Sequence, residues 1–154
     1  MQIAFPSGTY ALQGTPLPVS PPARPFNRVA FAAAHVVADP FSGSDPSGTP
    51  AIDWPTTLAF RTHLLDLGFG IAEAMDTSQR GMGLDWNSAH ELIRQSLAHA
   101  GSKAHLIASG CGTDHLAVAD ARTLDDVMAA YLMQLNAIQN LGGSNILMAT
   151  WALV

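Results

Sequence analysis

The chain has 154 residues, of which 48% are hydrophobic and 12% are charged, and its formal net charge is −5. This is enough apolar sequence for the core of one domain, whereas the scattered arginines and single lysine form no basic patch for nucleic acid or anionic membranes. The lone Cys111 excludes an internal disulfide, and no secretory signal or run of ~18 apolar residues is recognised, so we expect a cytoplasmic protein without a membrane partner.

The first 27 residues are predicted to form a unit of their own. Residues 1–5 and 9–12 have the pattern of two short strands joined by the turn Pro6-Ser7-Gly8, which indicates a β-hairpin. Residues 15–27 contain five prolines, which favour an extended strap over a packed element.

Residues 28–154 show a strand–helix pattern that repeats three times and continues into a fourth strand. Each strand is a short apolar run, and each predicted helix begins after a capping residue and ends at glycine. The predicted strands cover residues 28–34, 69–74, 104–109 and 145–150, and the helices lie between Asp53 and Gly68, Asp85 and Gly101, and Thr123 and Gly142.

The spacing of the strands predicts the fold class. They begin about every 35–41 residues, and eight such units would make ~300 residues, as in a TIM barrel. We therefore expect an α/β fold, the four-stranded N-terminal half of a (β/α)8 TIM barrel, preceded by the hairpin and the proline-rich strap. A doubly wound sheet is the alternative, but no Gly-x-Gly-x-x-Gly turn follows the first strand. Since no helix is predicted after the fourth strand, we expect an incomplete barrel.

Both folds bind ligands beyond the carboxyl ends of their strands, so the polar residues at these ends are the candidate site. Three of them, with carboxylates or imidazole for proton transfer, are the catalytic candidates: Glu73, Asp76 and His35. Six others are expected to bind a small-molecule substrate: Thr77, Ser78, Arg80, Asp39, Gly112 and Thr113.

The residue types suggest particular roles. Arg80 can hold an anion by two parallel hydrogen bonds, and the turn around Gly112 and Thr113 can offer backbone N–H groups to one. Glu73 acts in the barrel mouth if it points inward, and pairs with an arginine such as Arg61 if it points outward.

A cofactor is not required by this pattern. We assign no metal ligands, although His35, Glu73, Asp76 and His115 would be reasonable ligands of a divalent cation. The single lysine, Lys103, precedes the third strand at the opposite end, so this sequence contributes no Schiff-base nucleophile to the predicted mouth.

Three stretches resemble a bacterial family of unknown function whose members are often labelled dihydrodipicolinate-synthase-like. They are Arg28-Val-Ala-Phe-Ala-Ala-Ala-His-Val-Val-Ala-Asp-Pro40, Ala72-Glu-Ala-Met-Asp-Thr-Ser-Gln-Arg-Gly-Met-Gly-Leu-Asp-Trp86 and Ser109-Gly-Cys-Gly-Thr-Asp114. The resemblance covers about residues 1–152 and corresponds to the first half of a family member.

The resemblance implies a TIM barrel of the dihydrodipicolinate synthase and N-acetylneuraminate lyase superfamily, with Schiff-base lyase or aldolase chemistry. Asp76-Thr-Ser-Gln-Arg80 would correspond to the Gly-Thr-Thr-Gly-Glu loop of that superfamily, with Thr77 and Ser78 binding a keto-acid carboxylate. The catalytic tyrosine after strand four has no counterpart in Thr150-Trp151-Ala-Leu-Val154, and the superfamily's lysine belongs to a sixth strand.

The first functional hypothesis is therefore a lyase or aldolase-like enzyme acting on a keto acid or an oxidised sugar, inactive as this chain alone. A metal-dependent barrel isomerase or hydrolase acting on sugars is the second. A non-enzymatic half-barrel that assembles with another copy is the third, and a homo-oligomer is expected.

Overall fold

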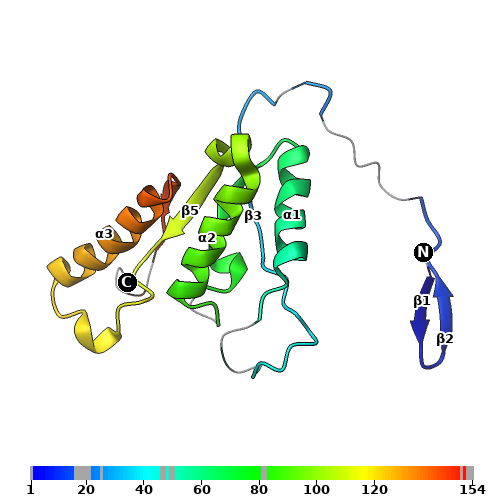
Figure 1. Cartoon of the computed structure of the whole chain (residues 1–154), viewed down its shortest axis with the longest axis horizontal. Helices are drawn as coiled ribbons and strands as arrows, with labels where there is room; N and C mark the ends of the chain where they lie inside the picture. The colour runs from blue at the N-terminus through cyan, green and yellow to red at the C-terminus, as the bar shows by residue number, and fades with distance from the viewer. Residues whose placement is uncertain are drawn as a thin grey trace.

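The structure is a computed structural model that describes residues 2–15, 22–24, 26–45, 48, 51–80, 83–149 and 151. At its N-terminus, β1 (Gln2–Phe5) pairs antiparallel with β2 (Gly8–Ala11), which confirms the predicted hairpin. Figure 1 shows this hairpin apart from the helices. Of the predicted strap, residues 16–21 and 25 lie outside the described residues.

The main sheet has four parallel strands that neighbour one another in chain order. They are β3 (Phe31–Ala33), β4 (Gly70–Glu73), β5 (Ile107–Cys111) and β6 (Ser144–Leu147). The mixed α/β class and the parallel sheet are thus confirmed, and the order shows no reversal of the kind that marks a doubly wound sheet.

One predicted strand was placed wrongly along the chain. Residues Gly101–Leu106 form a 3-10 helix (η2), so β5 begins at Ile107 rather than at residue 104 and extends to Cys111. Gly101 has φ +54°, and the chain turns there instead of entering the sheet. The predicted fourth strand ends at Leu147, and Thr150 lies outside the described residues.

All three predicted helices are present and start where their caps predict. They are α1 (Trp54–Asp66), α2 (Trp86–Ala100) and α3 (Leu124–Asn140). Asp53 accepts a hydrogen bond from the backbone of Thr56 and Asp85 one from that of Ser88, while Thr123 and Asp126 form a capping box. Two further 3-10 turns are η1 (Asp76–Ser78) and η3 (Val118–Asp120).

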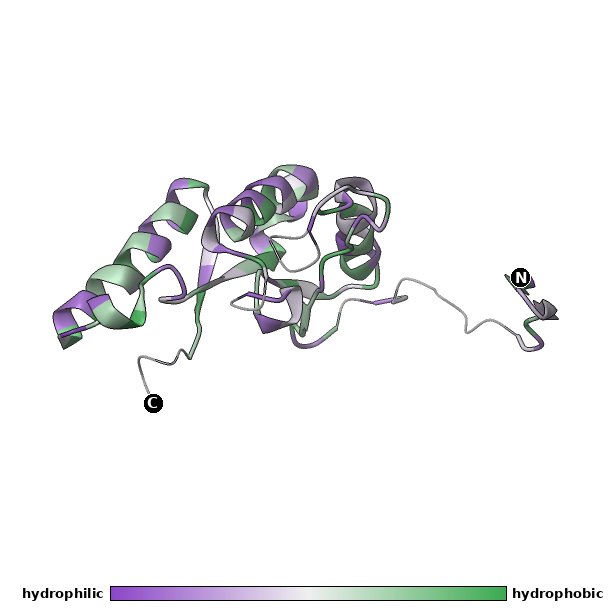
Figure 2. Ribbon diagram, turned by 90° about the horizontal axis from the view of Figure 1, so that it is seen from below, coloured by the Kyte–Doolittle hydropathy of each residue, from purple (hydrophilic) through white to green (hydrophobic). Residues whose placement is uncertain are grey.

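The three helices cover one face of the sheet, as Figure 2 shows. On that face Ile71, Ile107 and Cys111 point from the strands into the core. They meet apolar side chains of all three helices, among them Leu65, Leu92, Ile93 and Ile138. Each such side chain stabilises the fold by about 1.5–3 kcal/mol when fully buried.

On the opposite face of the sheet, the two central strands carry small residues. Because side chains alternate between faces, Gly70, Ala72, Ala108 and Gly110 lie on this side. Phe31 of β3 lies across Gly70, where an added Cβ would come 2.8 Å from its ring. The carboxyl ends of β4 and β5 lead into two loops that form the candidate site.

Candidate functional site

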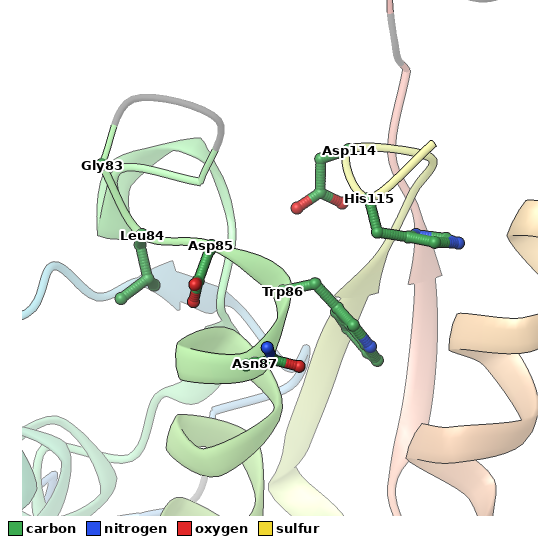
Figure 3. Close-up of a pocket in the computed structure, with 7 residues that line it drawn as sticks. All are labelled: Gly83, Leu84, Asp85, Trp86, Asn87, Asp114 and His115. Carbon is green, nitrogen blue, oxygen red and sulfur yellow. The ribbon is translucent and has the colours of Figure 1, made fainter. Parts of the chain in front are cut away.

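A pocket of about 380 Å³ lies between the start of α2 and the loop after β5 (Figure 3). It is thus at the carboxyl ends of neighbouring parallel strands, where ligands of such sheets bind. Its lining consists of Gly83, Leu84, Asp85, Trp86, Asn87, Asp114 and His115.

Arg80 is buried behind the pocket, and its guanidinium binds groups of the protein itself. The side chain is 1% exposed and is held by Asp114, with Nη2 2.5 Å from Oδ1 and Nε 3.3 Å from Oδ2. Nη1 donates to the carbonyls of Ala74 and Gly110, at 3.3 and 2.5 Å, and Nη2 also donates to Gln134 at 2.7 Å. A guanidinium has five N–H donors, and these five contacts to oxygen use all of them, while Nη1 also lies 3.7 Å from Sδ of Met148.

Asp114 contributes an ionised carboxylate to the pocket. Burial raises the pKa of a carboxyl, but hydrogen bonds from Arg80 and Gln134 outweigh this effect and lower the pKa of Asp114 below its ordinary value. Its side chain remains 20% exposed, so the carboxylate can still be reached from the pocket that it lines.

Gln134 of α3 is fully buried and makes four hydrogen bonds that join the parts of the site. Its Oε1 accepts from Arg80 and from the backbone N–H of Gly112, both at 2.7 Å. Its Nε2 lies 2.9 Å from Oδ1 of Asp114 and 2.8 Å from Nδ1 of His115. One amide thus links α3 to four groups of the two loops.

His115 lines the pocket beside an aromatic ring. Its imidazole centroid is 6.4 Å from that of Trp86, whose ring also lies over the guanidinium of Arg80, at 5.3 Å from Cζ. Partial burial lowers the pKa of His115; Asp114 raises it and Arg80 lowers it, and the net result is below the ordinary value. The site therefore favours a neutral imidazole next to an ionised carboxylate.

The structure brings two of the nine candidate residues into this cluster directly. Arg80 and Gly112 both bind Gln134, which the sequence analysis missed. The available signal was a polar residue within the buried stripe of α3, formed by Val127, Ala130, Gln134 and Ile138. Asp114 follows the third strand in the sequence, but its pairing with Arg80 requires contact across 34 positions of sequence.

Glu73 points toward the helices rather than toward the pocket. Its two oxygens accept from Nε and Nη2 of Arg61, each at 2.8 Å, and from Ser96 Oγ and the backbone of Ala74. Of the two orientations that the sequence allowed for Glu73, the structure therefore has the outward one, with Arg61 as the partner. The carboxylate has its hydrogen-bonding capacity filled inside the core.

Two candidates, His35 and Asp39, follow β3 and contact neighbouring groups of the protein. The ring of His35 packs on Phe60, with centroids 4.8 Å apart, and its carbonyl accepts from Arg61 at 2.7 Å. Asp39 accepts from the backbone of Phe41 at 2.9 Å, which is the geometry of an Asx turn. Neither lines the pocket described here.

The remaining candidates lie in the turns after β4 and β5. Asp76 and Thr77 are exposed, whereas the buried Ser78 donates from Oγ to the carbonyl of Met75 at 2.7 Å. Thr113 is buried, and its carbonyl accepts from the backbone of Leu116. The hydroxyl donor of Ser78 is thus used within its own turn, whereas Thr77 is exposed.

Within the described ranges, no three side chains of His, Cys, Asp or Glu are grouped as metal ligands. Likewise, no helix in the described part of the chain combines the length and apolarity needed to cross a bilayer.

The comparisons with known proteins give a family. No curated protein matches the chain. The model of one family, described as "Protein of unknown function (DUF993)", matches residues 5–154. Because this match spans all but the first four of the 154 residues, the chain belongs to that family.

Proposed function

We propose that this chain forms the substrate-holding part of a lyase or aldolase-like enzyme that acts on a keto acid or an oxidised sugar. The observation that carries the proposal is the pocket at the ends of β4 and β5, with ionised Asp114 beside His115. Pockets in this position are the usual substrate sites of parallel α/β proteins.

The lining suits a small molecule rich in hydroxyl and carbonyl oxygens. The carboxylate of Asp114 accepts hydrogen bonds from hydroxyls, and the exposed amide of Asn87 both donates and accepts. The indole of Trp86 offers an apolar surface for the C–H groups of a sugar-derived chain. The amino end of α2, whose partial positive charge favours carboxylates, borders the pocket, and the carboxylate of Asp85 caps it.

The proposed chemistry uses hydrogen bonds and proton transfer at the pocket. Cleaving a bond beside a carbonyl requires donors for the negative charge that develops on its oxygen. Lys103, the single lysine, lies in η2 before β5 and donates to Asp66 at 2.7 Å. A Schiff base in this pocket would therefore need a lysine from outside the given sequence.

The proposal also includes a more specific fold assignment, in which β3 to β6 are successive strands of a TIM barrel. Their parallel, sequential order supports it, as do the helices on one face and the small residues on the other. Within the described residues β3 and β6 are edge strands, and such edges tend to pair further. We expect the isolated chain to be inactive and to self-associate, and a stable monomer in light scattering would contradict that expectation.

Ligand binding tests the proposal directly. We would titrate 2-keto acids, aldonic acids and 2-keto-3-deoxy aldonic acids into 15N-labelled protein, with neutral sugars for comparison, and follow the amide resonances. Saturable shifts confined to residues 83–87 and 114–115 are expected for at least one class of acid. Mass spectrometry of the incubated mixtures would detect cleavage products.

A matched pair of variants tests whether the ligand binds in the pocket or elsewhere on the surface. Asn87→Ala removes a lining amide and should weaken binding by about 2- to 10-fold, the equivalent of one neutral hydrogen bond. Asn136→Ala removes an exposed amide from α3 and should leave the affinity unchanged. If no acid in the panel shifts the pocket resonances, the proposed substrate class is wrong.

A further inference from the structure

We infer that Gln134 is a positioning residue that places the proton of His115 on Nε2, so that the imidazole meets a substrate as a neutral hydrogen-bond donor. The placement of the proton follows from contacts within the protein. Only the donor role toward a substrate rests on the proposed function.

The orientation of the Gln134 amide is determined by two neighbours that can only donate. The guanidinium Nη2 of Arg80 and the backbone N–H of Gly112 both lie 2.7 Å from one amide atom. An amide nitrogen cannot accept these hydrogen bonds, so that atom is the oxygen. The NH2 group of Gln134 must then face the opposite side.

The orientation of Gln134 in turn determines the tautomer of His115. The amide nitrogen lies 2.9 Å from Oδ1 of Asp114 and 2.8 Å from Nδ1 of His115, and it has one N–H for each. Since this nitrogen donates, Nδ1 accepts through its lone pair. A neutral imidazole with an unprotonated Nδ1 carries its proton on Nε2.

The surrounding charges bear on the protonation state. Asp114 favours a cation at His115, while buried Arg80 and partial desolvation disfavour it. From α2, the uncharged ring of Trp86 lies beside His115, and its centroid is 5.5 Å from that of the His90 ring. An imidazolium would in addition turn an Nδ1–H toward the NH2 of Gln134 and lose the hydrogen bond between them.

In this tautomer, His115 acts on a substrate as a hydrogen-bond donor rather than as a base. Nε2 has no hydrogen-bond partner among the described residues, and its N–H can donate to a carbonyl or hydroxyl oxygen. Such a donor stabilises negative charge on that oxygen without a change of protonation at His115. Accepting a proton at Nε2 would require the ring to give up its hydrogen bond with Gln134.

Nuclear magnetic resonance of 15N-histidine-labelled protein tests the tautomer without any ligand. At neutral pH, His115 should show a protonated Nε2 and an unprotonated Nδ1 in long-range 1H–15N spectra. Its signals are identified by their loss in His115→Gln. A wild-type spectrum of the Nδ1–H tautomer, or of an imidazolium, would overturn the inference.

Two variants test the role of Gln134. Gln134→Glu puts an acceptor beside Nδ1, so the proton should move to that nitrogen and the protonation midpoint of His115 should rise. Gln139→Glu makes the same change at an exposed position of α3 and should leave the spectrum as in wild type. If Gln134→Glu does not fold, Gln134→Met removes the donor, and a mixture of tautomers is expected. An unchanged tautomer in either Gln134 variant would refute its positioning role.

The same spectra separate this inference from the proposed function. A bound acid that perturbs Nε2 but leaves Nδ1 unprotonated supports both. If the tautomer is as inferred but no acid in the panel perturbs His115, the substrate proposal and the donor role toward it fail, and the placement of the proton by Gln134 stands.

Discussion

Arg61 and Glu73 form a bidentate ion pair closed off from solvent, with side chains 1% and 0% exposed and two N–O distances of 2.8 Å. Ser96 donates to the same carboxylate at 2.6 Å, so the pair connects α1 and α2 to the end of β4. The backbone N–H of Ala74 also donates to it, at 2.8 Å. Glu73 is the last residue of β4, so the pair lies where the loop that leads to the pocket begins.

Glu73→Gln should lower the free energy of unfolding by about 3–5 kcal/mol, because it leaves the charge of Arg61 buried without a counterion. Urea denaturation measures the change. Glu91→Gln is the control, since Glu91 and Arg94 are 40% and 51% exposed and their pair contributes only about 0–1 kcal/mol. Equal effects of the two substitutions would show that the Arg61–Glu73 pair is not buried in solution.

Arg80→Lys should lower the free energy of unfolding by about 2–4 kcal/mol. An ammonium has three donors for contacts that use five, so buried acceptors such as the carbonyls of Ala74 and Gly110 lose their partners. Arg94→Lys, on the exposed face of α2, provides the comparison and should change stability by less than about 1 kcal/mol. A stable Arg80→Lys protein with unchanged Asp114 and Gln134 resonances would contradict the five-contact arrangement.

Gln79→Gly should raise the free energy of unfolding by about 0.5–1 kcal/mol. Gln79 is exposed and has φ +65°, a left-handed conformation that glycine adopts at lower energy than other residues. Gln139→Gly makes the same change in the last turn of α3 and should destabilise by a similar amount. A loss of stability in Gln79→Gly would indicate that the turn after β4 has another conformation.

Stability should fall as the pH decreases in two separate ranges. The lowered pKa of His115 means that the unfolded chain takes up a proton first, so stability is lost below the ordinary histidine range near 6.5. The lowered pKa of Asp114 causes a second loss of stability below its ordinary value of 3.8, because protonation of the carboxylate removes its ion pair with Arg80. Denaturation at a series of pH values measures both.

The variant His115→Gln isolates the first of these ranges. It removes the titrating imidazole, so the loss just below the ordinary histidine range should become smaller, while the loss below the ordinary range of Asp114 remains. An identical pH profile in the variant would show that His115 titrates alike in the folded and unfolded chains.

The local elements were largely predictable because their signals lie within a few residues. Asp53, Asp85 and Thr123 each cap a helix that begins at the next residue, and the capping box needs only Thr123 and Asp126. The start of β5 was not predictable in the same way. The apolar residues Ala104 and Leu106 fit a strand, but the 3-10 turn η2 places Ile107 in register with Ile71.

The contacts of the site were much less predictable than the helices and strands. The pattern of residues alone indicated that polar side chains follow the strands, and parallel strands bring such side chains to one edge of the sheet. It did not indicate that Glu73 turns to Arg61 in the helix layer, or that Arg80 binds Asp114 and Gln134; these contacts became known from the folded structure. A buried charge binds whichever partners the packing of helices on the sheet brings within about 3 Å, and sequence spacing does not specify those partners.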